Sequence, residues 1–248
     1  MTNKSSRWAE EISGLNAKIL AIYGGIILLV HVLWNTIIIY PLKILTVFFH
    51  ELSHALVAIV TGGKVLEIVL VPEQGGHCLI AGGNAFLVCS AGYLGSLIWG
   101  GIILVSAASS RRDKQIMIAL GAILMAVSFI WIRPLISFGF IFCIILGGAM
   151  MASGNYLPTK LNDWALRTVG LTSCLYATLD VKDDTIDRNL KESDAGRLAE
   201  ITGMPSLFWG YLWMALAIAG TVFFILLAAQ AQRKAKGKTG ESKLPKPS

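Results

Sequence analysis

The chain has 248 residues, of which 55% are hydrophobic and 15% are charged, and its formal net charge is +6. A soluble domain averages about 25% charged residues. Because the apolar residues also come in long blocks, the composition excludes an ordinary soluble core and indicates a multi-pass membrane protein. The basic residues gather in a loop and in the C-terminal tail with no aromatic residues among them, which argues against a nucleic-acid partner.

Seven apolar blocks are expected to form helices in or across the bilayer. In chain order they cover about 17–40, 42–60, 86–108, 116–132, 134–152, 164–181 and 206–229. The sixth contains Arg167 and Asp180 and could instead be re-entrant or interfacial. The predicted fold class is therefore an all-α polytopic membrane protein with about six to seven transmembrane helices. We expect a polar segment at 1–16, a single membrane domain at 17–230 and a basic, disordered tail at 231–248.

The segment between the second and third blocks, about 63–84, predicts a small β-hairpin inserted among the helices. "KVLEIVLV" has the β-branched content of a strand, "HCLIA" could be its partner, and three glycine pairs punctuate the segment. It is too polar to span a bilayer alone, so protein or water should cover it. The third block contains "SAGYLGSLIWGG", whose small residues let helices approach closely in lipid.

The distribution of Lys and Arg predicts the orientation of the chain. Seven spans place the 111–114 loop and the C-terminal tail on one side, and both are rich in Lys and Arg. The positive-inside rule therefore predicts that the tail is cytoplasmic. The N-terminus would then lie outside or in a lumen.

The second block carries the pattern H-E-x-x-H, formed by His50, Glu51 and His54. Residues at i and i+4 share one face of a helix, so both imidazoles can bind one metal ion. Glu51 then projects beside that metal, where it can take a proton from a zinc-bound water and pass it to a leaving amine. The pattern predicts two metal ligands, His50 and His54, and a catalytic Glu51, with one Zn²⁺ per chain.

The alternative for these residues is a pair of structural histidines that hydrogen-bond between helices. Ionisable side chains at the bilayer centre cost a few kcal/mol or more, so intramembrane ionisable residues are functional candidates by default. Zinc binds neutral imidazoles and leaves Glu51 beside a dication. The membrane setting thus favours the metal site.

A catalytic zinc usually takes three protein ligands plus water. Asp180, at the end of the sixth block, is the favoured third ligand, and Asp183 and Asp184 could share its helical face. His31 is expected to make a helix–helix hydrogen bond, and His77 to be a loop residue of the hairpin, with lining of the site as the alternative for His77. No substrate-binding residue is predicted.

These motifs resemble the site-2 protease family of intramembrane zinc metallopeptidases, in its compact B-type branch. The resemblance rests on "PLKILTVFFHELSHALVAIVTGGKV", "PEQGGHCLIAGGN", "AGYLGSLIWGG" and "CLYATLDVKDDTIDRNLKESDA". It implies zinc ligands at His50 and His54, a catalytic glutamate at Glu51, and an aspartate on a later helix, matched here to Asp180. "LDV" lacks the glycine that follows this aspartate in better-known members. "AGYLGS" lacks their proline and asparagine, so no oxyanion-stabilising residue is carried over.

The leading hypothesis is an intramembrane zinc endopeptidase that cleaves membrane-spanning proteins within or near the bilayer. The exposed edge of the hairpin could hold an unwound substrate segment by β-addition. A catalytically silent scaffold that binds membrane clients is the alternative, although the complete H-E-x-x-H pattern argues against it. A transporter would be expected to carry polar residues on several helices and an internal repeat, and the sequence shows neither.

Overall fold

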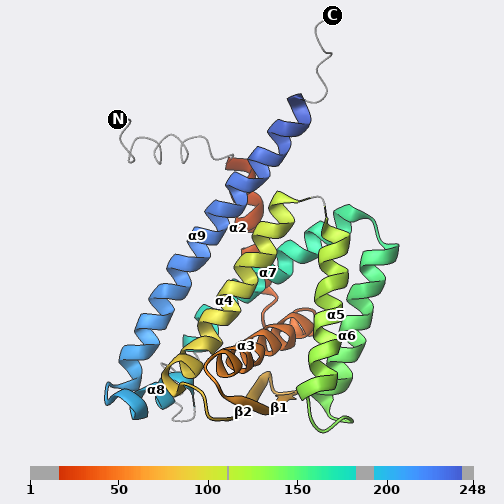
Figure 1. The fold of residues 1–248 in the computed structure, drawn as a ribbon. Helices are drawn as coiled ribbons and strands as arrows, with labels where there is room; N and C mark the ends of the chain where they lie inside the picture. The colour runs from red at the N-terminus through yellow and green to blue at the C-terminus, as the bar shows by residue number, and fades with distance from the viewer. Residues whose placement is uncertain (1–16, 111, 183–192, 242–248) are drawn as a thin grey trace, which may run out of the picture.

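A computed structural model describes residues 17–110, 112–182 and 193–241. Its elements are α2 (Ala17–Val32), α3 (Tyr40–Val60), β1 (Lys64–Val71), β2 (Gly75–Ala81), α4 (Ala85–Ser109), α5 (Asp113–Trp131), α6 (Phe138–Tyr156), α7 (Thr159–Val181), α8 (Asp194–Thr202) and α9 (Ser206–Glu241). Figure 1 shows a helical bundle with one small sheet at its lower end. The predicted fold class, helical and polytopic with a hairpin after the metal-motif helix, is confirmed.

Five of the described helices are long and apolar enough to cross a membrane. They are α3, α4, α5, α6 and α9. Helix α2 has only 16 residues because the first apolar block leaves helical geometry after Val32, and α7 falls below the others in hydropathy. The chain is therefore a multi-pass membrane protein, with fewer qualifying spans than the six to seven expected.

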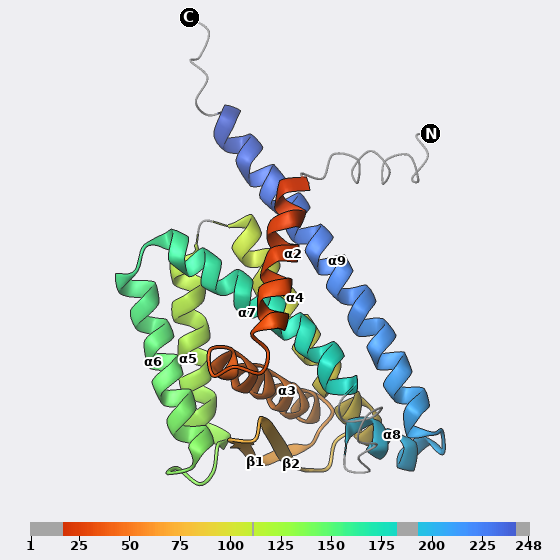
Figure 2. The ribbon, with the colours of Figure 1, turned by 180° about the vertical axis from the view of Figure 1, so that it is seen from behind.

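Helix α3 lies inside the bundle rather than at its surface. It runs obliquely, at a steep angle to α5 and α6 (Figures 1 and 2). In its most apolar stretch 72% of the residues are buried, against 28% in the corresponding stretches of α5, α6 and α9. The outer helices thus present apolar side chains outward, while α3 is enclosed by protein.

Glycines allow α4 to approach its neighbours closely, as its small-residue pattern predicted. A Cβ added at Gly95 would overlap the Ser53 side chain of α3, and one added at Gly100 would lie 2.6 Å from the Gly170 carbonyl oxygen of α7. Gly101 faces the ring of Phe224 on α9 in the same way. Helix α4 is therefore the central helix of the bundle, and α3, α7 and α9 pack against it.

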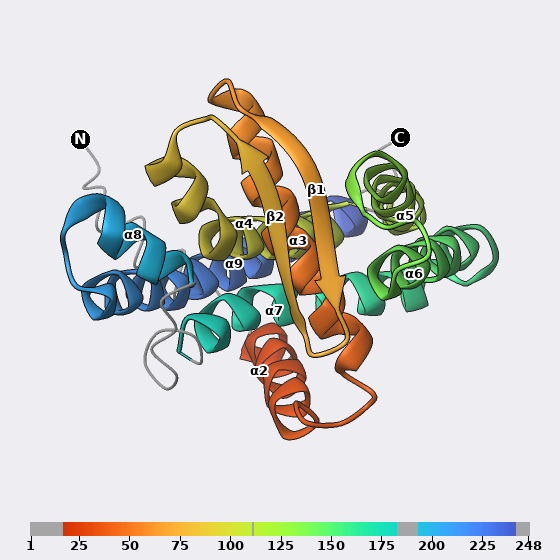
Figure 3. The same ribbon diagram turned by 90° about the horizontal axis from the view of Figure 1, so that it is seen from below.

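The hairpin lies directly against α3 (Figure 3). Strands β1 and β2 pair antiparallel, with Val69 opposite His77 and a register irregularity between Val65 and Glu67. The outer edge of β1 is bridged to the end of α5, where Ile68 pairs with Ile132. In the part of the chain that the structure describes, no backbone hydrogen bond joins the outer edge of β2 to another element. The sheet therefore has one covered edge and one open edge.

The start of α2 packs beside the second half of α9 at one end of the bundle. Ile19 and Tyr23 of α2 pack in one apolar cluster with Ala228 and Ala229 of α9. The expectation that the N-terminus lies opposite the C-terminal tail is therefore wrong for the start of α2. The reason is that α3 runs obliquely within the bundle instead of crossing from end to end (Figures 1 and 2).

Helix α9 also extends further than its apolar block. It continues to Glu241, so residues 231–241 are helical where disorder was expected, and residues 242–248 lie outside the described part. The end of α4, the start of α5 and the end of α9 all lie at the upper end in Figure 1. The described residues that flank the basic loop therefore lie at the same end of the bundle as the end of α9, while the membrane side of the tail stays a prediction.

Candidate metal centre

Helix α3 brings His50 and His54 together on one face. Pro41 stands in the first turn, where its missing N–H costs no helical hydrogen bond, and the helix then runs without interruption to Val60. The two imidazole rings lie 4.8 Å apart, centroid to centroid. The i, i+4 spacing therefore places the two side chains as the sequence predicted.

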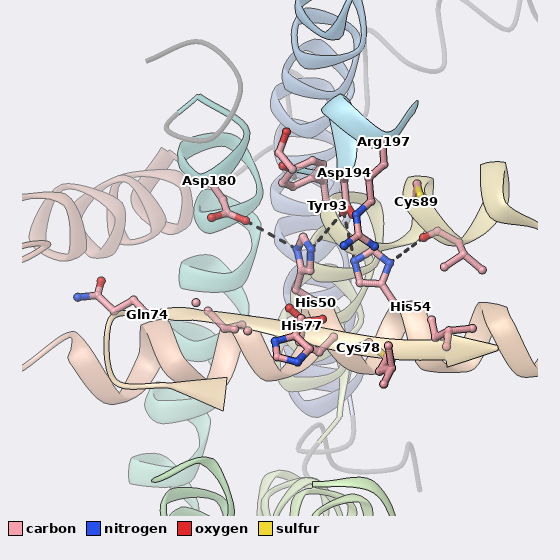
Figure 4. Close-up of a pocket in the computed structure, with 18 of the residues that line it drawn as sticks. His50, His54, Gln74, His77, Cys78, Cys89, Tyr93, Asp180, Asp194 and Arg197 are labelled. Atoms are coloured by element: carbon pink, nitrogen blue, oxygen red, sulfur yellow. Dashed lines mark hydrogen bonds and ion pairs between the residues drawn. The ribbon is translucent and has the colours of Figure 1, made fainter. Parts of the chain in front are cut away.

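The carboxylate that meets both histidines belongs to Asp194, the first residue of α8. Its Oδ2 lies 3.2 Å from Nε2 of His50 and 3.2 Å from Nε2 of His54 (Figure 4). The three ligand atoms of His50, His54 and Asp194 all lie within 4.8 Å of one another. This is the one three-residue group of metal-binding type within the described residues.

Local sequence fixes the place of Asp194. Ser193 caps α8, since its Oγ accepts a hydrogen bond from the Gly196 backbone N–H at 3.1 Å. Ala195 and Leu198 are fully buried and pack with Tyr93 of α4 in an apolar cluster that also includes Trp residues of α9. The cap and this apolar face hold α8 so that Asp194 points into the site.

His54 is oriented by a second contact on the other side of its ring. Its Nδ1 lies 2.7 Å from the backbone carbonyl oxygen of Val88 in α4. Because a carbonyl only accepts, Nδ1 donates its proton to Val88, and Nε2 is the nitrogen that faces Asp194. Such outer-shell hydrogen bonds fix the tautomer of metal-binding histidines.

Asp180, the favoured third ligand from sequence, does not join this group. It lies in the last turn of α7 and approaches His50 from the opposite side of the ring, with its Oδ2 3.7 Å from Nδ1. The alternatives Asp183 and Asp184 lie outside the described residues. The structure thus brings the predicted His50 and His54 together with Asp194, and leaves Asp180 beside them.

Gly92 of α4 leaves room for the two ligand side chains. A Cβ added there would overlap Nε2 of His50 and Oδ2 of Asp194. Any other residue would therefore occupy the space in which these two side chains meet. The glycine lies in "SAGYLGS", so the same small-residue stretch that packs helices also opens the site.

Glu51 is buried and faces the same cavity as the two histidines. Gly76 of β2 covers it, since a Cβ added at Gly76 would lie 3.0 Å from the Glu51 Oε1. Gly75 and Gly76 begin β2 instead of forming the turn that the glycine pair suggested. A small residue at 76 lets the strand pass close over the carboxylate.

A cavity of about 680 Å³ opens over these residues. Its walls come from α3, β2, α4, α7 and α8, and they include Tyr93, Tyr176 and Arg197. His77 of β2 lines it, whereas His31 is exposed at the end of α2 and does not. A volume of this size is typical of ligand-binding sites.

The donor set fits a divalent metal. Oδ2 of Asp194 is buried and has no hydrogen-bond partner of acceptable geometry in the described part of the chain. Burial alone would raise the pKa of this carboxyl, but the adjacent His54 and His50 hold the pKa below its ordinary value. A buried carboxylate and two imidazoles converging on one point form the His/His/carboxylate ligand set of catalytic zinc sites.

Comparison with family models matched residues 23–225 to the Peptidase M50B-like family. The chain belongs to the Peptidase M50B-like family. The resemblance to the site-2 protease family and its B-type branch is thereby confirmed. No match was found among curated proteins or among solved structures. M50B-like membership and the His–His–Asp group together indicate a membrane-embedded peptidase with a potential metal site.

Asp194 was missed because its local sequence looks like an ordinary helix start. "SDAGRLAE" has a Ser cap, and acidic residues are common in a first turn, where the helix dipole favours them. Asp194 also lies outside every apolar block, and only the M50B-like block that ends at Ala195 includes it. The available signal was this capped, amphipathic helix placed directly after the last membrane aspartates.

Proposed function

We propose that this M50B-like chain is an intramembrane zinc metalloendopeptidase that hydrolyses peptide bonds of membrane-spanning proteins within or near the bilayer. One observation supports this most directly. Two histidines of an H-E-x-x-H helix, a carboxylate from a distant helix and the buried Glu51 all face one cavity. A pair of structural histidines would not need a third converging ligand atom or a neighbouring carboxylate.

His50, His54 and Asp194 would hold one zinc ion per chain. When bound, zinc lowers the pKa of a coordinated water and polarises a carbonyl group. Nε2 of each histidine and Oδ2 of Asp194 face the same point, so the ligand atoms need no rearrangement of α3 or α8. Enclosure of α3 by the other helices keeps lipid away from these polar groups.

Glu51 moves the proton in this mechanism. Its carboxylate accepts a proton from the attacking water as the new C–O bond forms at the scissile carbonyl. It then donates that proton to the amide nitrogen as the C–N bond breaks, so water is added across the bond and Glu51 is restored. Its burial beneath Gly76 keeps the carboxylate out of bulk water.

The open edge of β2 is the proposed place for the substrate backbone. A peptide bond in a transmembrane helix is shielded by helical hydrogen bonds and must be unwound before hydrolysis. The β2 residues from Gly75 to Ile80 line the cavity, and the outer edge of β1 is already bridged to α5. An unwound segment that pairs with β2 by β-addition would lie directly above Glu51.

The proposed orientation places the C-terminal tail in the cytoplasm. The basic loop and the tail lie at the same end of the bundle, and the metal centre lies toward the other end, with the hairpin and α8 (Figure 1). Cleavage would therefore occur nearer the non-cytoplasmic face. The substrate is a transmembrane protein, and the lipid bilayer is the second partner.

The test compares wild type with Glu51→Gln in two experiments. Membrane proteomics of cells that carry either form should reveal full-length transmembrane proteins that accumulate only with Glu51→Gln. The best candidate is then co-reconstituted in liposomes with purified protein and zinc, where wild type should cleave it and Glu51→Gln should be at least about 100-fold slower, as expected for loss of a general base.

The matched control is Glu200→Gln, which neutralises an exposed carboxylate on α8. It should cleave at the wild-type rate. Equal cleavage by wild type and Glu51→Gln would overturn the mechanism. A client that copurifies with zinc-loaded wild type but is never cut would instead support the scaffold alternative.

A further inference from the structure

The two histidines differ in what contacts the ring nitrogen that faces away from Asp194. On His54 that nitrogen has a short contact, 2.7 Å, with the Val88 carbonyl oxygen. On His50 the corresponding Nδ1 is buried and makes no hydrogen bond within the described residues. A buried N–H left without a partner costs free energy. His50 is therefore the less well oriented of the two candidate ligands.

The polar group that comes nearest to this nitrogen is the carboxylate of Asp180. Its Oδ2 lies 3.7 Å from Nδ1, and both side chains are largely shielded, with exposed fractions of 13% for His50 and 17% for Asp180. Figure 4 shows Asp180 and Asp194 on opposite sides of the His50 ring. Asp180 lies in the last turn of α7, whereas Asp194 begins α8, so the two carboxylates reach His50 from different elements.

This placement argues against Asp180 as a ligand of the same ion. The nitrogens of an imidazole point in different directions, and Asp194, which also contacts His54, lies on the Nε2 side of His50. A metal bound there is shielded from Asp180 by the His50 ring itself. A carboxylate on the Nδ1 side is instead the arrangement of a carboxylate–histidine–metal triad.

The distance between Oδ2 of Asp180 and Nδ1 of His50 excludes a bridging water. At 3.7 Å the contact is longer than a hydrogen bond. It is too short for an intervening water, which would separate the two atoms by about 5 Å. A direct hydrogen bond would need a side-chain rotation that brings Oδ2 of Asp180 closer to Nδ1 of His50.

We propose that Asp180 is a positioning residue of the metal centre: its carboxylate accepts the Nδ1–H of His50, fixes the tautomer that presents Nε2 to the ion, and strengthens that nitrogen as a ligand. The inference rests on the proposed metal site, and it gives the two histidines different outer partners. His54 is held by a backbone carbonyl that no substitution removes, and His50 by a side chain that can be changed.

The experiment measures zinc affinity of the purified full-length protein by competition with a chromogenic chelator. Asp180→Asn keeps the shape of the side chain but removes its charge. We expect it to weaken zinc binding about 10- to 100-fold, while saturating zinc still gives one ion per chain. Asp180→Glu, which restores the carboxylate, should recover most of the affinity.

Absorption of the Co²⁺-substituted protein supplies a second readout. The Asp180→Asn spectrum should keep the intensity of wild type, since the number of ligands is unchanged, with a shift in band position because His50 is a weaker donor. Asp194→Asn should change the intensity itself. Glu200→Gln, a charge-matched control on the exposed face of α8, should leave both affinity and spectrum unchanged.

Two results would overturn the inference. Wild-type affinity and an unshifted spectrum in Asp180→Asn would show that Asp180 has no role at the site. Loss of stoichiometric zinc at saturation in Asp180→Asn, with retention in Asp194→Asn, would make Asp180 the ligand. If wild type binds zinc and follows the expected pattern but cleaves nothing, the proposed peptidase function fails while the role of Asp180 stands.

Discussion

The Oδ2 atom of Asp194 lies 3.2 Å from the Nε2 atom of His54, although one residue begins α8 and the other lies on α3. The same oxygen is equally close to His50. One carboxylate from the C-terminal part of the chain therefore completes a pair of imidazoles from its N-terminal part.

Replacement of Asp194 should remove the metal. With Asp194→Ala only two protein ligands remain, so zinc affinity should fall by more than the 10- to 100-fold typical of outer-shell changes. Zinc content after gel filtration, measured by atomic emission, checks this. Glu200→Ala on the exposed face of α8 is the control, and a full zinc complement in Asp194→Ala would show that the third ligand lies elsewhere.

A methyl group at position 92 should disable the site without unfolding the protein. The added Cβ of Gly92→Ala would overlap the ligand atoms of His50 and Asp194, so both side chains must move apart. Zinc affinity should drop at least about tenfold, as for outer-shell changes that disturb ligand geometry.

The control for this substitution is Gly148→Ala in α6, where an added Cβ has no neighbour within 4 Å. Circular dichroism should show unchanged helix content in both variants. Gly92→Ala with wild-type zinc affinity would mean that the ligands do not meet where the structure places them.

The thiol of Cys78 should be alkylated slowly, and the rate should depend on the charge of Glu51. Burial, and then the charge of Glu51, raise the pKa of Cys78 to about 12, against about 8.5 for a free cysteine. Since only the thiolate reacts, alkylation at pH 8 should be about a thousandfold slower than for a free thiol. The rate should rise tenfold per pH unit from pH 7 to 10, without the plateau that an ordinary thiol reaches.

The contribution of Glu51 to the pKa of Cys78 is tested by substituting Glu51 in protein from which a chelator has removed metal. Glu51→Gln removes the negative charge, so the pKa of Cys78 should fall and its alkylation should accelerate. Peptide-resolved mass spectrometry with iodoacetamide measures the rate. Glu67→Gln on β1 is the comparison, and equal rates in the two variants would place Glu51 away from Cys78.

Substitution of Gly100 should destabilise the bundle. The Cβ of Gly100→Ala would lie 2.6 Å from the Gly170 carbonyl oxygen, so α4 and α7 must separate. Overpacking of this kind costs about 1–3 kcal/mol. A lower midpoint of thermal unfolding in detergent would show it, whereas Gly24→Ala, with open space around the added Cβ, should unfold like wild type.

The sequence predicted the features that depend on neighbouring residues in the chain. It did not predict the features that depend on how the helices pack. H-E-x-x-H on one helix face, the hairpin after it and the close-packing glycines of α4 all follow from short-range patterns, and the structure confirms that His50 and His54 lie together. Each of these three predictions depends only on the periodicity of the sequence or on the size of a residue.

The third partner could not be found in that way. Asp180 lies near the end of an apolar block, whereas Asp194 follows a polar stretch. Which of them meets His50 at Nε2 depends on how α8 packs against α4 and α9. The oblique path of α3 is equally invisible to hydropathy, because its length and composition match those of a helix that crosses the bilayer. That path explains how a residue in the middle of α3 can meet the ends of α7 and α8.

The position of Asp194 has a consequence for biogenesis. His50, Glu51 and His54 are synthesised early, but the site stays incomplete until α8 follows and packs against α4 and α9. A nascent or truncated chain that ends before α8 therefore carries the motif without the completed site. The order of synthesis therefore delays completion of the His–His–Asp group until α8 has packed into the assembled protein.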